Sequence, residues 1–167
     1  MTRPSSAFPA GVAVRPEAFE GDGPSWVVTR AEAELVERYG DLDEGERGLT
    51  TAMFEPPLGV FIVARSENGT RPVGGVGVHR VGETGTGEVK RLWVEPAWRG
   101  RGLGRRLMGD LEDAARGIGV AVLQLGTGER QPEAVALYES AGWERLHVDA
   151  DGHSLPLCHI RFGKRLD

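Results

Sequence analysis

The sequence predicts an α/β fold in which an antiparallel meander of strands leads into one parallel crossover. Three short, β-branched segments over residues 59–96 are separated by glycine-containing turns. Two segments with apolar residues at helical spacing, 102–119 and 131–142, lie on either side of a continuous apolar segment at 120–128. The chain has 167 residues, which suffices for one domain with a real core and is short for two. We therefore expect a single domain over 1–167.

The N-terminal part is expected to supply one strand and one helix. Residues 1–11 are rich in Pro, Ser and Ala, and we expect a loose leader there, followed by a short strand at 12–15. The segment "SWVVTRAEAELVERYG" at 25–40 places apolar residues near one face of a helix, and Gly40 provides a stop signal. The acidic connector at 41–57 ends in two prolines, so we expect no regular element through it.

The central part predicts three antiparallel strands. The segments 59–67 and 71–81 flank an Asn-Gly turn, which is typical of a hairpin. A third strand, 88–96, follows a glycine-rich turn and is stopped by Pro96. Strands joined by such tight turns pair antiparallel.

The C-terminal part alternates helices and strands. The helix at 102–119 is expected to start at about Leu103 and to end at its two glycines. The apolar segment at 120–128 is typical of a strand buried on both faces. After the helix at 131–142, two strands are expected within 143–148 and 155–162.

Composition excludes several classes of protein. The net charge of −5 argues against binding to nucleic acid or anionic membranes, and the longest apolar run, at 58–64, is too short to span a bilayer. Cys158 is the only cysteine, which excludes an internal disulfide and fits a reducing, cytoplasmic location. The four histidines lack zinc-type spacing, so we expect no metal.

One segment, "WRGRGLGRRLM" at 98–108, combines glycines with dense positive charge. Gly100, Gly102 and Gly104 lie between a predicted strand and a predicted helix, so the backbone can approach a ligand closely. The unpaired N–H groups at the start of the helix favour binding of an anion, and we expect that anion to be a pyrophosphate. The cations expected to add a positive field are Lys90, Arg91, Arg99, Arg101, Arg105 and Arg106.

Other phosphate-binding loops do not match this segment. The pattern GxxxxGK[ST] is absent, and the spacing here is GxGxG rather than GxGxxG. A dinucleotide-binding loop would also follow the first strand of a domain, whereas this segment follows a meander. The alternative to a phosphate-binding loop is a glycine-rich turn with solvated arginines that binds no ligand.

The segment "VEPAWRGRGLGRRLM" resembles motif A of the GCN5-related N-acetyltransferases, the GNAT superfamily. Its pattern, [Q/R]-x-x-G-x-[G/A], is filled by Arg99, Gly102 and Gly104. In addition, "EVKRLWVEP" resembles the fourth strand of that superfamily, "AVLQLGTG" the fifth, and "QPEAVALYESAGW" the following helix and turn. The resemblance runs from about Gly59 to the end of the chain and specifies the superfamily but no substrate.

The resemblance implies a three-layer fold. Its twisted sheet is mixed, mostly antiparallel, and splayed between the fourth and fifth strands, with helices on both faces and a V-shaped cleft for acetyl-CoA. Backbone groups of the fourth strand would hold the pantetheine arm, and N–H groups of the glycine loop would hold the pyrophosphate. Gln131 stands where many members have Asn. The cofactor residues implied are Leu92, Trp93, Val94, Arg99, Gly100, Arg101, Gly102, Leu103, Gly104, Arg105 and Gln131.

Two residues are candidates for proton transfer. Glu88 starts the strand, where histone-acetylating members carry their glutamate base, and its effect could run through a water. Tyr138 matches the tyrosine general acid of the family and could protonate the departing thiolate. The structural alternatives are a solvated carboxylate for Glu88 and a packed core tyrosine for Tyr138.

The function implied is acetyl-CoA-dependent N-acetyl transfer, by direct attack of a primary amine of unknown identity. One alternative is a non-catalytic acyl-CoA-binding regulatory module of the same fold, and another is a nucleotide-binding protein of a different fold. The acidic connector is either a solvated loop or a cover that attracts a cationic amine; its acidic residues include Asp41, Asp43, Glu44 and Glu46. Because many members pair through edge strands, a homodimer is also expected.

Overall fold

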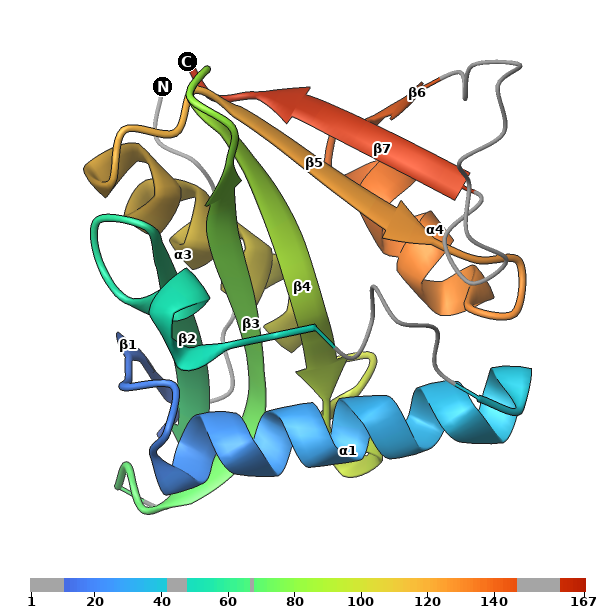
Figure 1. Cartoon of the computed structure of the whole chain (residues 1–167). Helices are drawn as coiled ribbons and strands as arrows, with labels where there is room; N and C mark the ends of the chain where they lie inside the picture. Colours follow the sequence, from blue (N-terminus) through green and yellow to red (C-terminus); the bar gives the residue numbers. More distant parts are fainter. Residues whose placement is uncertain (1–10, 42–47, 67, 147–159) are drawn as a thin grey trace, which may run out of the picture.

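The structure, a computed structural model, describes residues 11–41, 48–66, 68–146 and 160–167. It contains one seven-stranded sheet in the order β1-β2-β3-β4-β5-β7-β6 (Figure 1). The strands are β1 (Ala13–Pro16), β2 (Gly59–Ser66), β3 (Arg71–Val81), β4 (Thr86–Val94), β5 (Val122–Thr127), β6 (Glu144–Leu146) and β7 (Ile160–Arg165).

The predicted meander and crossover are both confirmed. β1 through β4 pair antiparallel in chain order, and β4 pairs parallel with β5. The connection between β4 and β5 carries a helix, as a parallel crossover requires. The α/β class, with a mixed and mostly antiparallel sheet, is therefore confirmed.

The sheet opens between β4 and β5. These strands are paired only where Thr86, Gly87 and Glu88 lie beside Val122, Leu123 and Gln124. Beyond Glu88 the two strands diverge and leave a V between them (Figure 1). On its other edge, β5 remains paired with β7 as far as Thr127.

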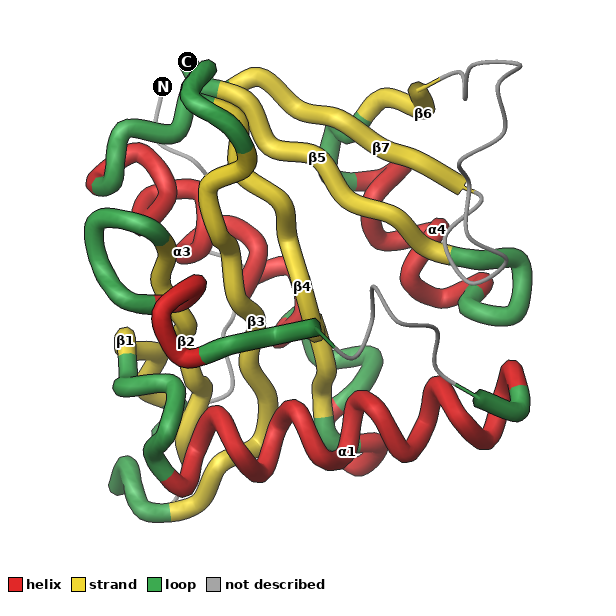
Figure 2. The backbone as a smooth tube through the Cα atoms, in the orientation of Figure 1, coloured by secondary structure: helices red, strands yellow, loops and turns green. Residues whose placement is uncertain are grey.

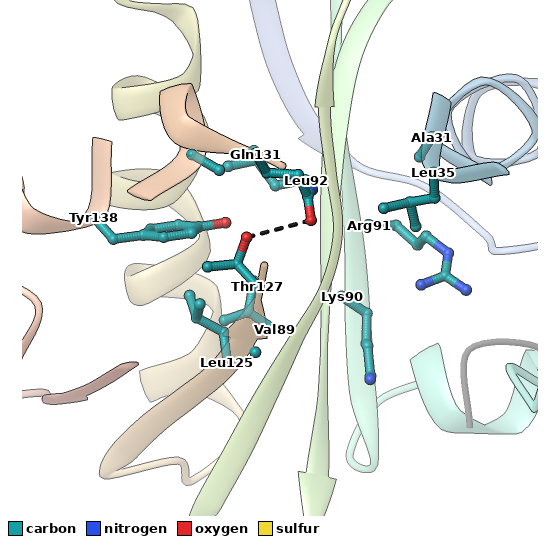
Figure 3. A pocket seen from close by; sticks show the side chains of 12 residues that line it. Ala31, Leu35, Val89, Lys90, Arg91, Leu92, Leu125, Thr127, Gln131 and Tyr138 are labelled. Carbon is teal, nitrogen blue, oxygen red and sulfur yellow. Dashed lines mark hydrogen bonds between the residues drawn. The ribbon is translucent and has the colours of Figure 1, made fainter. Parts of the chain in front are cut away.

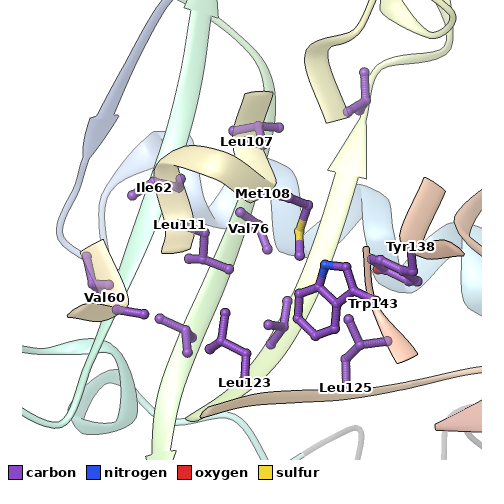
Figure 4. Packing of buried hydrophobic residues seen from close by; sticks show 14 of the residues in the cluster. Val60, Ile62, Val76, Leu107, Met108, Leu111, Leu123, Leu125, Tyr138 and Trp143 are labelled. Carbon is purple, nitrogen blue, oxygen red and sulfur yellow. The ribbon is translucent and has the colours of Figure 1, made fainter. Parts of the chain in front are cut away.

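The helices form two layers around the sheet (Figure 2). α1 (Asp22–Tyr39) covers one face, and α3 (Leu103–Gly117) and α4 (Pro132–Ser140) cover the other. The larger core lies on the side of α3 and α4, where Leu107, Met108 and Leu111 pack against the sheet (Figure 4). The smaller core lies under α1 and gathers Val27, Phe54, Phe61 and Trp93 among others.

Several sequence expectations need correction. The connector carries a short 3₁₀ helix, η1 (Thr51–Phe54), because one turn fits before the prolines and buries Phe54. α1 begins at Asp22 rather than at residue 25. β5 is not buried on both faces: Leu123 and Leu125 point into the core, while Gln124 is partly exposed where the sheet opens.

Some expectations fall on residues outside the described part of the chain. These are the leader at 1–10, residues 42–47 of the acidic connector, with Asp43, Glu44 and Glu46, and the first part of the last predicted strand, with Cys158. The described part of that strand, β7, runs from Ile160 to Arg165.

Candidate active site

The glycine-arginine loop joins β4 to α3 through a short 3₁₀ turn, η2 (Pro96–Trp98). Gly100 and Gly102 have φ angles of 76° and 84°, in the left-handed region that glycine adopts without strain. Gly102 is the N-cap of α3 and offers no side chain to the first turn. The N–H groups at the start of α3 are therefore left for an anion, as the sequence predicts.

A cavity of about 300 Å³ lies in front of this loop, between the end of β4 and α4. A Cβ on Gly104 would lie 3.3 Å from Leu137 Cδ2 and 3.9 Å from Val94 Cγ2, so a side chain here would intrude on the wall of the cavity. The loop therefore fits a close-lying diphosphate. Of the expected cofactor residues, the cavity is lined by Leu92, Trp93, Val94, Arg99, Gly100, Gly102, Leu103, Gly104, Arg105 and Gln131.

A second cavity of about 100 Å³ occupies the V between β4 and β5 (Figure 3). Leu92, Gln131 and Ala134 line both cavities, so the two spaces adjoin. Tyr138 and Thr127 bound the second cavity on one side of β4, and α1 bounds it on the other through Ala31 and Leu35. A long, thin ligand could run from the glycine loop into the V.

β4 is irregular where it borders the V. Gly75 pairs with Trp93 and Gly77 pairs with Lys90, so β4 holds one extra residue between these pairs. Arg91 takes a φ of 59°, which is uncommon for a residue other than glycine. The bulge changes the direction of β4 where the strand borders the cavity. The alternation of side chains in the sequence did not predict this bulge.

The β5-facing edge of β4 has no strand partner beyond Glu88. Its backbone groups can therefore hydrogen-bond an extended ligand as an added strand would. The carbonyl of Val94 already accepts a hydrogen bond of 2.8 Å from Arg99 Nε. The expected backbone contacts of the pantetheine arm are thus more available at Leu92 than at Val94.

The arginines of the loop differ in their partners. Arg99 donates to both carboxylate oxygens of Glu34 on α1, at 3.2 and 2.7 Å. Arg105 donates to Ser140 Oγ at 2.6 Å, which ties α3 to the end of α4. Arg106 pairs with Asp110 one turn along α3. Arg91 lies apart from this group, because its side chain is buried and pairs with Glu32 on α1.

Glu34 is a site residue that sequence reasoning missed. Its carboxylate lines the larger cavity and also accepts a hydrogen bond of 2.5 Å from Trp93 Nε1. Burial by itself would raise the pKa of Glu34, but the hydrogen bonds from Arg99 and Trp93 outweigh it and lower that pKa. No local signal marks one glutamate on a charged helix, since only the tertiary structure brings it beside the loop.

Tyr138 combines a packed ring with a free hydroxyl. The ring lies 5.8 Å from that of Trp143 and 5.6 Å from that of Phe162. Its hydroxyl points toward the V (Figure 3) and makes no hydrogen bond to any described residue. Burial raises the pKa of Tyr138, so the phenol keeps its proton and can act as a donor.

Gln131 lies at the junction of the two cavities, as the N-cap of α4. Its side-chain carbonyl accepts hydrogen bonds of 3.4 Å each from Tyr39 on α1 and from Thr127 on β5. Its amide NH₂ donates to no described residue, so these donors are available to a ligand.

Glu88 lies at the closed end of the V, at the last paired position of β4 and β5. Its carboxylate is 3.2 Å from Lys90 Nζ and 3.8 Å from an Arg161 nitrogen, and Gln124 donates to it at 3.5 Å. Glu88 does not line the second cavity, whereas Lys90 does. A proton would therefore reach Glu88 from the cavity through an intermediary such as a water.

In residues 11–41, 48–66, 68–146 and 160–167, no three His, Cys, Asp or Glu side chains gather as a metal site would need. No helix in these ranges is long and apolar enough to cross a membrane.

Comparison with known proteins agrees with this geometry. Residues 22–143 match the model of the acetyltransferase (GNAT) family. An N-alpha-acetyltransferase RimI of Mycobacterium tuberculosis is 38% identical over 126 residues, which cover 71% of this chain and 77% of the relative. An IAA acetyltransferase of Azospirillum brasilense is 38% identical over 113 residues, which cover 66% and 72% of the two chains.

Solved structures show the same fold. A GNAT acetyltransferase of Staphylococcus aureus superposes with a TM-score of 0.74 at 13% identity, covering 94% of this chain and all of the other. The PaiA N-acetyltransferase of Thermoplasma acidophilum, solved with coenzyme A, superposes with a TM-score of 0.67 at 13% identity, covering 93% and 99%. The chain belongs to the GNAT acetyltransferase family and is an acetyl-CoA-dependent N-acetyltransferase.

Proposed function

We propose that this enzyme transfers the acetyl group directly to a primary amine on a small molecule or peptide, with Glu88 as the base and Tyr138 as the acid. The observation that carries the proposal is the position of the Tyr138 hydroxyl. It faces the V opposite the unpaired edge of β4, and its raised pKa keeps it protonated.

The cofactor site would divide between the two cavities. Bound acetyl-CoA supplies an activated thioester carbonyl and a thiolate leaving group. The N–H groups at the start of α3 and the glycine backbone bind the diphosphate, and the free edge of β4 with the Gln131 amide orients the pantetheine arm.

Two protons must move during the transfer. An amine with a lysine-like pKa is mostly ammonium at neutral pH, and it must lose a proton before its nitrogen attacks the carbonyl carbon. Glu88 takes that proton through a water, since Glu88 does not line the cavity itself but pairs with Lys90, which does. As the carbon–sulfur bond breaks, the Tyr138 hydroxyl donates its proton to the departing sulfur, and the phenolate is reprotonated by the proton that the attacking nitrogen loses as it becomes the amide.

We also propose a cytoplasmic location for the enzyme and no nucleic-acid partner. The single cysteine supports a cytoplasmic location, and the net charge supports a protein without nucleic-acid partners. We also propose that residues 1–167 act as one domain and that copies pair through an edge strand of the sheet, where β1 and β6 lie.

The first test is calorimetric titration with acetyl-CoA, with ATP and NAD as controls, followed by release of free thiol in the presence of a panel of amines. We expect saturable binding of acetyl-CoA alone and thiol release with a subset of primary amines. Binding of acetyl-CoA without thiol release from any amine would favour the non-catalytic module.

The assignment of Glu88 is tested by Glu88→Gln. We expect turnover to fall by roughly 100-fold and the acidic limb of the rate–pH profile to flatten. Glu112→Gln is a matched control, because Glu112 also pairs with a lysine, Lys164, but lies outside the residues that line either cavity. Wild-type rates across pH in Glu88→Gln would remove Glu88 from the mechanism.

A further inference from the structure

The arginines around the glycine loop are not equivalent, although they look alike in the sequence. Arg99 is occupied by Glu34 and by the Val94 carbonyl, with all three kinds of guanidinium nitrogen engaged. Arg105 is bound to Ser140, and Arg106 to Asp110. Arg99 therefore links the loop to α1 and Arg105 links α3 to α4, whereas Arg106 only pairs with another residue of α3.

Arg101 is the exception. Its guanidinium has no hydrogen bond or carboxylate partner among the described residues, and it lies over the ring of Trp98, 5.2 Å from the ring centroid. Such a cation–π contact restrains the arginine without using its N–H donors. Arg101 therefore keeps a full set of donors, held in place and open to solvent.

The position of Arg101 indicates which group it could bind. Trp98 lines the larger cavity, whereas Arg101 does not. If the diphosphate binds the N–H groups of α3 inside that cavity, an anion bound by the Arg101 side chain would lie at the rim, outside it. Coenzyme A carries one further phosphate beyond its diphosphate, on the 3′ position of the ribose.

We propose that the Arg101 side chain, held against Trp98, binds the 3′-phosphate of coenzyme A and makes the enzyme prefer it to dephospho-coenzyme A. The planar guanidinium suits a phosphate through two parallel N–H contacts. The carboxylates near the loop do not oppose this role, because Glu34 and Glu133 are each paired with an arginine. This inference rests on the proposed binding of the cofactor at the glycine loop.

The test is a cycle of two ligands and two proteins, measured by calorimetry without turnover. Coenzyme A and dephospho-coenzyme A are titrated into the wild type and into Arg101→Ala. We expect the wild type to bind coenzyme A roughly five-fold more tightly than dephospho-coenzyme A, and Arg101→Ala to bind both about equally. Arg101→Lys should keep part of the preference, because it keeps the charge and loses the planar fork.

Arg106→Ala is the matched control, since it removes the same charge from the same segment but from an arginine paired with Asp110. It should keep the wild-type preference. If Arg101→Ala weakens both ligands equally, the side chain contacts the diphosphate and the proposal is overturned. It is also overturned if Arg101→Ala retains the full preference, or if the wild type has none. Failure of the wild type to bind coenzyme A at all would instead refute the cofactor site itself.

Discussion

The two halves of β4 differ in their strand pairing, and this difference explains how the sheet forms a binding site. The first half, from Thr86 to Glu88, is paired on both edges, with β3 and with β5. The second half keeps only its β3 neighbour and contains the bulge at Arg91. Backbone groups that are satisfied in the first half are left for a ligand in the second.

The side chains follow the same division. Around the paired half, glycines and valines pack so closely that a Cβ on Gly87 would lie 2.9 Å from Val78 Cγ2. Around the open half lie two cavities and the unbonded hydroxyl of Tyr138. Apart from Glu88, whose carboxylate lies at the closed end of the V, substitutions in the paired half should therefore cost stability. Substitutions around the open half should cost binding or turnover.

The largest expected effect is on turnover, from Tyr138→Phe in the open half. We expect kcat to fall by roughly 100-fold, because the donor to the departing sulfur is lost. The free energy of unfolding should hardly change, since the hydroxyl has no hydrogen bond to lose among the described residues. Steady-state kinetics and chemical denaturation measure the two quantities. A large loss of stability with unchanged kcat would make Tyr138 a packing residue.

The next effect is on cofactor affinity, from Gly104→Val. The new side chain would press on Leu137 and fill the cavity before the loop, so we expect acetyl-CoA to bind roughly ten-fold more weakly or worse. Gly109→Ala in the same helix is the control, since a Cβ there meets nothing within 4 Å. It should raise stability by about 0.5–1 kcal/mol and leave affinity unchanged.

A smaller effect is expected on stability alone, from Gly87→Ala in the paired half. The added methyl would meet Val78 and Val120 in the core, so unfolding should become easier by about 1–3 kcal/mol. Denaturant titration measures the loss, and calorimetry should find the affinity for acetyl-CoA unchanged in the folded protein. An affinity loss as large as that of Gly104→Val would contradict the division of β4.

The smallest effect concerns pH, at His79, which pairs across the sheet with Glu88. Burial lowers the pKa of His79, although the hydrogen bond to the Arg80 carbonyl and the nearby Glu88 charge oppose this and Lys90 adds to it. As pH falls, His79 is protonated at a higher pH in the unfolded chain than in the folded chain, and this favours unfolding. The stabilisation that comes from the neutral His79 is therefore complete above the unfolded pKa of about 6.5 and is lost as pH falls below it.

His79→Phe should remove this dependence. The ring is only half-buried, so the effect is small. Between about pH 7.5 and pH 5.5, we expect the free energy of unfolding of the wild type to fall by at most about 0.5 kcal/mol more than that of the variant. Parallel denaturation curves at the two pH values measure the difference. Equal losses in both proteins would show that other groups carry the acid sensitivity.

Local sequence patterns were enough to predict the helices and strands and the position of the glycine loop between β4 and α3. Turn dipeptides, apolar spacing and stop glycines located the meander and the helices, because these signals act over a few neighbouring residues. The glycines at 100, 102 and 104 marked the loop for the same reason: φ angles and close approach are local properties. The resemblance to the GNAT superfamily rested on these short motifs.

The way in which distant residues come together around the cavities is visible only in the folded chain. The bulge at Arg91 depends on the register with β3, and the role of Glu34 depends on α1 crossing beside the loop. The sequence also made the loop arginines look equivalent, whereas their partners separate Arg99 from Arg101. Pairing between groups far apart in the chain is set by packing of whole elements, and no local pattern encodes it.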